Sequence, residues 1–276
     1  MELTARSPAI ASPDDWIMPR ISRRHRIWRI IRDNPLGMIG LAIVVLLVLV
    51  AISAPWTAPH SPDDILVGPK LLGPSMDHPF GTDDLGRDML SRVMYGARIS
   101  LMVGLAAVLF GTLAGTVLGI LAGYVGGLLD AFISRIIDMF IAFPALLLLL
   151  ILRQVMGPSA QTLIIAIGIA IIPGIARVVR GEVVSQRNNQ YVEAAVTLGA
   201  ATPRILFLHI APNIAALAII VMTSILGGAV LAEAALSFLG LGIPSSVTWG
   251  VDVNSARLSQ HTTLAWAFFP GAAIAL

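Results

Sequence analysis

Long apolar runs separated by short polar stretches dominate this chain. Runs with few or no charged residues cover about 36–54, 99–122, 131–152, 161–176, 214–232 and 264–276. A helix that spans a bilayer needs about 20 mostly apolar residues, and the runs lack the alternation of apolar and polar positions found in membrane barrels. The pattern therefore predicts an all-α integral membrane protein with six transmembrane helices.

The two ends of the chain depart from this regular pattern. A helix over 264–276 would extend only about 20 Å, so we expect the sixth helix to be cut short where the sequence stops. Residues 1–35 are polar and rich in arginine, and 21–31 mixes arginines with apolar residues. This mixture predicts a basic amphipathic helix on the membrane surface, with a solvated basic tail as the alternative. We expect a tail over 1–35 and a transmembrane domain over 36–276.

Composition narrows the class of protein further. Hydrophobic residues make up 57% of the chain and charged residues 12%, which excludes disorder and argues against a soluble protein. A net charge of +2 argues against nucleic-acid binding, and the absence of cysteine excludes disulfides and thiolate metal sites. Lys70 is the only lysine and stands outside any phosphate-loop motif. We expect no catalytic, cofactor-binding or metal-binding residues in this chain.

Basic residues predict the orientation in the membrane. With the N-terminus inside, the segments 1–35, 123–130 and 177–213 hold eleven arginines and lysines, whereas the outside segments 55–97, 153–160 and 239–263 hold five. Inside loops carry the excess of basic residues. We therefore expect a cytoplasmic N-terminus, an outer loop over 55–97 and a cytoplasmic loop over 180–212.

Glycines form a regular stripe in the second run. Gly111, Gly115, Gly119 and Gly123 recur every four residues, which places them on one helix face. Small residues allow helices to approach closely in lipid, so the stripe predicts a packing face.

Three ionisable residues lie within the apolar runs and are candidates for the transport pathway or a gate. Arg135 and Asp138 are three residues apart, so a mutual pair that stabilises helix packing is the main interpretation and contact with substrate is the alternative. Glu233 lies near the outer end of the fifth run and is either a pathway residue or interfacial.

The loop over 180–212 carries a specific layout. The stretch from Tyr191 to Ala200 predicts a helix that breaks at Gly199, and Pro203 permits a second short helix that continues through Arg204. Pro212 then leads into the next run. Two short helices held at an angle predict a docking surface for a partner.

This loop resembles the EAA loop of ABC-transporter permeases. The resemblance rests on Glu193-Ala194-Ala195, on Gly199 after three intervening residues and on Pro212. In that family the loop is the coupling helix, seated in a groove of the ATPase subunit. Histidine before Pro-Asn is similar to dipeptide, oligopeptide and nickel importers, whereas Ala211 replaces the usual leucine.

Two further segments agree with the second permease of such importers. One is 81–88, followed by Ser91-Arg92 and 96–101; the other is 233–242, followed by Trp249-Gly250. Ser245-Ser246 stand where the family usually has two prolines.

The first of these segments also suggests a helix on physical grounds. Thr82 can cap a helix whose first turn holds Asp83, and the spacing predicts ion pairs between Asp83 and Arg87 and between Asp88 and Arg92. We expect a lid helix over the outer mouth, with a solvated amphipathic helix as the alternative.

The resemblance implies a type I ABC importer permease fold in a bacterial inner membrane. It implies a heterodimer with a sister permease, two ATPase subunits that hold ATP and Mg²⁺, and an external substrate-binding protein. Short peptides are the implied cargo, and nickel or another small solute is the alternative. A self-contained secondary transporter is the competing class, which the sparse charges in the runs disfavour. The implied coupling residues are Tyr191, Glu193, Ala194, Ala195, Gly199, Pro203, Arg204 and Pro212.

Overall fold

The computed structural model describes residues 35–259 and 264–276, and all regular elements in this part of the chain are helical. The predicted amphipathic helix over 21–31 lies outside the described residues. The chain divides into residues 1–46 and 47–276, and the packing described below belongs to the second unit.

The helices are α2 (Pro35–Thr57), α3 (Met89–Val125), α4 (Gly127–Ala142), α5 (Ala145–Met156), α6 (Ala160–Arg187), α7 (Gln190–Thr197), α8 (Thr202–Ile205), α9 (Ala211–Leu236), α10 (Trp249–Leu258) and α11 (Leu264–Ala275), with π-helical turns η2 (Leu206–Ile210) and η3 (Ser237–Leu241).

Four helical segments are long and apolar enough to cross a membrane. They contain the first, second, fourth and fifth predicted runs, and the pair α4 and α5 can provide a fifth crossing. The helix α11, over the sixth run, is a shorter apolar helix of 12 residues. The all-helical membrane fold is therefore confirmed for the described part of the chain.

The third run differs from the continuous helix that we expected. It forms α4 and α5, whose axes meet at 96°. Phe143 ends α4 in an extended conformation and Pro144 precedes α5. The residue before a proline is driven away from helical geometry, so Phe143-Pro144 is the signal for this break.

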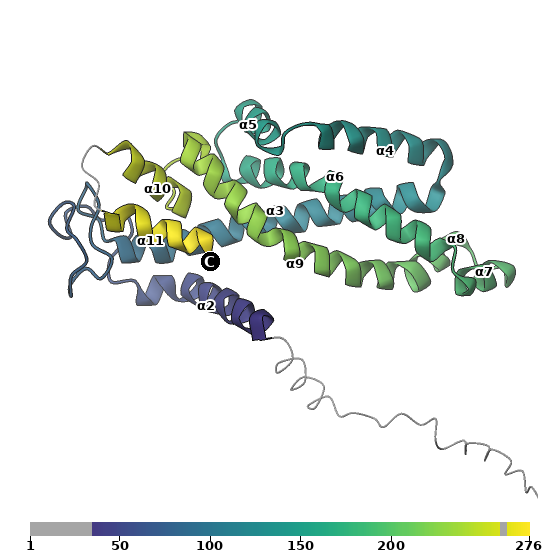
Figure 1. Ribbon diagram of the computed structural model, residues 1–276, viewed down its shortest axis with the longest axis horizontal. Coiled ribbons are helices and arrows are strands. Elements are labelled where there is room, and N and C mark those ends of the chain that lie inside the picture. The colour runs from purple at the N-terminus through teal and green to yellow at the C-terminus, as the bar shows by residue number, and fades with distance from the viewer. Residues whose placement is uncertain (1–34, 260–263) are drawn as a thin grey trace, which may run out of the picture. The chain divides into compact units, whose positions relative to one another are not determined.

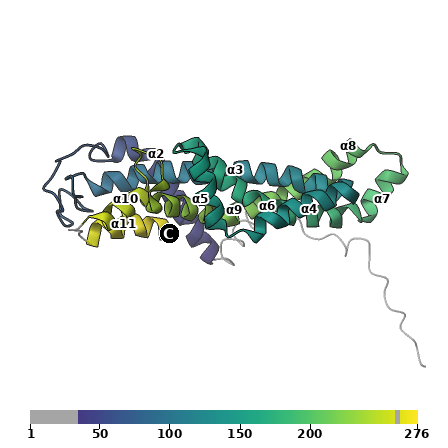
Figure 2. The same cartoon turned by 90° about the horizontal axis from the view of Figure 1, so that it is seen from above.

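The glycine stripe brings α3 and α6 into close contact, as predicted. A Cβ atom at Gly119 would lie 2.7 Å from the Val179 side chain, and one at Gly123 would lie 2.9 Å from the Arg180 carbonyl oxygen. Along the stripe, positions on α3 and α6 advance together, so the two helices run parallel. Figures 1 and 2 show them side by side.

The main core lies where α3, α5, α6 and α9 meet. Buried members include Val103 and Val108 of α3, Leu149 of α5 and Leu163 of α6. On α9, Val230 packs over Gly104 of α3. This core packs the middle of α3 against its neighbours. The α7–α8 turn lies toward one end and α10 and α11 lie beside the other (Figure 1).

Candidate coupling surface

The helices α7 and α8 form a folded turn that internal contacts hold in shape. Helix α7 ends in a Schellman motif: Gly199 N–H donates to Val196 at 2.9 Å, and Ala200 N–H donates to Ala195 at 3.0 Å. Gly199 has φ +78, the left-handed region that favours glycine. A Cβ at this position would meet nothing within 4 Å, so the backbone conformation rather than crowding requires glycine.

Apolar residues anchor this turn to the rest of the unit. Val192 of α7 and Ile205 of α8 are buried in a cluster with Val179 and Val183 of α6. Pro203 lies in the first turn of α8, and Pro212 lies in the first turn of α9. The predicted helix, break and second helix are therefore all present.

The outward face of the turn is apolar and contains small residues. Val196 is 58% exposed and Leu198 88% exposed, and Ala194 is exposed between them and Tyr191. Ala195 is half-buried and belongs to the anchoring side, whereas Arg204 is exposed. The Tyr191 hydroxyl donates to Gln186, and its ring meets the His209 ring edge-on at 6.3 Å.

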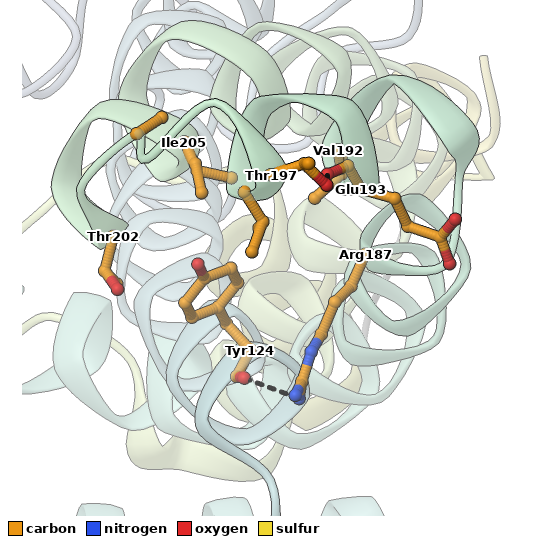
Figure 3. A pocket seen from close by; sticks show the side chains of 9 residues that line it. Tyr124, Arg187, Val192, Glu193, Thr197, Thr202 and Ile205 are labelled. Atoms are coloured by element: carbon orange, nitrogen blue, oxygen red, sulfur yellow. Dashed lines mark hydrogen bonds between the residues drawn. The ribbon is translucent and has the colours of Figure 1, made fainter.

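Glu193 lies on α7 with its carboxylate in solvent. Among the described residues its carboxylate has no hydrogen-bond or ion-pair partner, and Figure 3 shows it directed away from Tyr124 and Thr202. The carboxylate lies in the first turn of α7, where the helix dipole favours negative charge. Glu193 is therefore free to accept a hydrogen bond from another subunit.

A pocket of about 680 Å³ lies between this turn and the ends of α3 and α6, and of the nine residues that line it only Glu193 was predicted as a coupling residue. Tyr124 lies in the last turn of α3 and Arg187 ends α6, and Arg187 Nη1 donates to the Tyr124 carbonyl oxygen at 2.8 Å (Figure 3). The Arg187 guanidinium also lies 5.8 Å from the centre of the Tyr124 ring. These contacts join the end of α6, directly before the turn, to the end of α3. The only sequence signal was a basic residue placed directly before the turn.

In the segment 58–92, at the other end of α3, residues 82–88 do not form the predicted lid helix. Gly81 and Gly86 have φ +77 and +71, and left-handed residues interrupt a helix. Helix α3 begins only at Met89, where the Asp88 carboxylate caps it by accepting from Ser91 N–H at 2.9 Å. The Thr82 hydroxyl donates instead to the Pro69 carbonyl oxygen at 2.5 Å.

One of the two predicted ion pairs in this segment is present and the other is wrong. Asp83 accepts from Arg87 Nε at 2.5 Å. Arg92 does not pair with Asp88; its Nε and Nη2 donate to Asp252 of α10 at 2.9 and 2.5 Å. Because Asp88 caps the helix, its carboxylate is already occupied and points away from the next turn.

The pair of Arg92 and Asp252 is buried. Its side chains are 3% and 1% exposed, and Arg92 Nη1 also donates to the Pro62 carbonyl oxygen at 2.8 Å. Burial raises the pKa of the Asp252 carboxyl, and the charge of Arg92 opposes that rise. The pair joins α3 to α10 across 160 positions of sequence.

Comparison with known proteins shows the family to which the chain belongs. Residues 115–276 match the family described as binding-protein-dependent transport system inner membrane component, and residues 22–74 match the N-terminal TM domain of oligopeptide transport permease C. The chain is 39% identical to the dipeptide transport system permease protein of Bacillus subtilis (strain 168), over 96% of this chain and 88% of the relative.

This chain belongs to the binding-protein-dependent transport permeases. It is also 40% identical to the glutathione transport system permease protein of Escherichia coli O1:K1 / APEC, over 91% of this chain and 84% of the relative. Among solved structures, the MetNI methionine ABC transporter in inward-facing conformations matches with a TM-score of 0.56 and 18% identity, over 68% of this chain and 90% of that chain. This last match shows a shared fold. The permease is an inner-membrane component by its family.

The three candidate pathway residues of the permease lie in different surroundings. Arg135 is exposed on α4 and does not pair with Asp138, contrary to the main interpretation. Asp138 pairs with Arg177 of α6, and Asp130 accepts from Arg180 at 2.5 and 2.7 Å. Two ion pairs thus join α4 to α6.

Glu233 of the permease is fully buried on α9. Ser100 Oγ of α3 donates to it at 2.8 Å, and Ser237 Oγ donates to it at 2.7 Å. Hydrogen bonding offsets the cost of burying this polar group between helices. In this chain Glu233 therefore joins α3 to α9.

Proposed function

We propose that this permease is one of two membrane subunits of an ABC importer for short peptides. A sister permease completes the pathway, an external binding protein delivers the cargo, and two ATPase subunits bind ATP with Mg²⁺. The ATPase seats on the α7–α8 turn at the cytoplasmic face. Relatives named for dipeptide and glutathione transport support a peptide cargo over nickel or another small solute.

One observation carries the docking proposal. The α7–α8 turn is anchored by Val192 and Ile205, yet it exposes apolar side chains at Val196 and Leu198 and an unpaired carboxylate at Glu193. A rigid, exposed apolar surface with a charge beside it is typical of an interaction site. The excess of basic residues in 1–35 and 177–213 supports a cytoplasmic location for this turn.

The proposed mechanism is alternating access. When ATP closes the ATPase dimer, the seated turn moves, and contacts through Val192 and the Tyr124–Arg187 hydrogen bond carry that motion to α3 and α6. ATP or the cargo shifts the equilibrium between two conformational states of the importer only if it binds those states with different affinities. The chain supplies no lysine for a phosphate loop, so nucleotide chemistry belongs to the partner.

The test replaces Glu193 in the reconstituted importer. A carboxylate that accepts from a partner arginine forms a strong charge-assisted bond, and removing one member of such a buried pair costs about 3–5 kcal/mol. We expect Glu193→Ala to abolish peptide transport and peptide-stimulated ATPase activity while the protein still inserts and binds its sister permease. The measurement is transport and ATPase rate in proteoliposomes, with assembly checked by co-purification.

Glu182 provides the matched control. It lies on α6 and accepts from Gln186 Nε2 at 2.6 Å, one and a half turns before the helix ends. Glu182→Ala is expected to leave transport near the wild-type rate. Normal coupling in the Glu193→Ala complex would overturn the assigned role, and nickel transport in place of peptide transport would overturn the proposed cargo.

A further inference from the structure

Two histidines and an aspartate gather beside the start of α3, in residues that the transport mechanism does not use. A nitrogen of His60, a nitrogen of His78 and a carboxylate oxygen of Asp88 all lie within 4.8 Å of one another. The histidine rings lie 5.7 Å apart, centre to centre. His78 and Asp88 are buried, and His60 is half-buried. The fold thus unites residues that look isolated in the sequence.

These groups have the chemistry of a transition-metal site. Imidazole nitrogen and carboxylate oxygen are the usual cysteine-free ligands of Zn²⁺, with bonds of about 2.0–2.2 Å and tetrahedral geometry. Such bonds place two ligand atoms about 3.3 Å apart. His78 Nδ1 and Asp88 Oδ1 are 3.0 Å apart, close to this spacing.

The surroundings of His78 determine which of its nitrogens can bind an ion. A Cβ atom at Gly68 would lie 2.6 Å from His78 Nε2 and 3.2 Å from the Thr82 methyl group. Gly68 therefore lies close to the Nε2 side of the ring, and a side chain at this position would contact Nε2. Nδ1, on the side of Asp88, is the nitrogen left for a ligand.

His60 supplies an independent observation. Its Nδ1 is buried and has no hydrogen-bond partner among the described residues. A buried polar atom without a partner is unfavourable, and coordination of an ion would remove that cost. The backbone N–H of His60 donates to Ser91 Oγ at 3.1 Å, and that hydroxyl donates to Asp88 Oδ2 at 2.7 Å. Ser91 thus positions two of the ligands from outside the site, as supporting residues do in metal centres.

We propose that His60, His78 and Asp88 bind one resident divalent transition-metal ion of the Zn²⁺ class. The ion takes the place of the proton between His78 Nδ1 and Asp88 Oδ1, and that proton leaves to solvent. Three protein ligands leave a fourth position for water. The ion fastens the segment 58–88 to the start of α3, in a chain that has no cysteine for a disulfide.

The experiment titrates Zn²⁺ into the purified full-length chain in detergent and measures binding by calorimetry and the midpoint of thermal unfolding. We expect one equivalent to bind and to raise the unfolding temperature. His60→Gln is the chosen variant, because Asp88 also caps α3 and its replacement would remove that cap. It should bind at least about tenfold more weakly and lose the thermal shift.

His209→Gln is the control, since this histidine lies in η2, far along the chain from the cluster. It should bind Zn²⁺ like the wild type. A second readout uses Co²⁺, whose tetrahedral complex absorbs visible light strongly in the wild type and weakly in His60→Gln. Equal Zn²⁺ affinity in the wild type and His60→Gln, or no binding by the wild type, would overturn the proposal.

Discussion

The two ends of α3 use charged and polar residues in opposite ways. At the α7–α8 end, local interactions build the turn, and Glu193 keeps its carboxylate in solvent. At the 58–92 end, Arg92 and Asp252 are buried and tied together across 160 positions of sequence. An exposed charge on a rigid turn is available to a partner, whereas a buried pair is already committed to its own fold. In the proposed function, the α7–α8 end is the one that transmits force, and the end with the buried pair is a fixed support.

The largest expected effect comes from breaking the buried pair. Arg92→Gln leaves the Asp252 carboxylate buried and unpaired, which should lower the free energy of unfolding by about 3–5 kcal/mol. The measurement is thermal or denaturant unfolding of the purified chain. Arg98→Gln, an exposed arginine on the same helix, should change stability by less than about 0.5 kcal/mol.

The same variant should respond to pH. Burial already raises the pKa of Asp252, and loss of Arg92 raises it further, so the folded variant binds a proton more readily than the unfolded chain. The variant therefore loses stability as pH rises from the pKa of Asp252 in the unfolded chain to its higher pKa in the folded chain. It regains this stability as pH falls. A loss of stability that is the same at pH 5 and pH 8 would contradict this account of the pair.

A smaller loss of stability is expected when α3 and α6, the helices that run between the two ends, are forced apart. In Gly119→Leu the new side chain would meet Val179 and the Ala176 carbonyl oxygen, at 2.7 and 2.8 Å from its Cβ. Overpacking of this kind costs about 1–3 kcal/mol and should also reduce transport. Gly174→Ala on α6, where a Cβ would meet nothing within 4 Å, is the control and should behave like the wild type in both assays.

The smallest effect on stability should come from the turn itself. Gly199→Val forces a β-branched residue into φ +78, at about 1–2 kcal/mol, whereas Gly199→Asn tolerates that conformation better. We expect transport to fall far more in the valine variant than in the asparagine variant. Equal transport by both would show that the left-handed turn is not needed for coupling.

The sequence predicted the α7–α8 end much better than the 58–92 end, because the α7–α8 end depends on local backbone signals. Gly199, Pro203 and Pro212 act on their own backbone, so the helix, break and second helix could be read from local signals. The glycine stripe on α3 likewise follows from helix periodicity.

The 58–92 end depends on partners that no local pattern reveals. The i, i+4 spacing predicted that Arg92 pairs with Asp88, yet its partner lies on α10. His60 and His78 are 18 positions apart and meet only because the segment folds back on Ser91. Phe143-Pro144 carried a readable signal for the break between α4 and α5, which the continuous apolar pattern obscured.

The central claim is that the α7–α8 turn seats on the ATPase subunit, and one cross-linking measurement tests it most directly. The chain has no cysteine, so Val196→Cys on α7 and Asp84→Cys in the 58–88 segment provide single labelling sites, both exposed. Each is coupled to a photoreactive maleimide in the assembled importer and illuminated. We predict that Val196→Cys cross-links to the ATPase subunit and Asp84→Cys does not. A cross-link to the ATPase from Asp84→Cys, with none from Val196→Cys, would contradict the account.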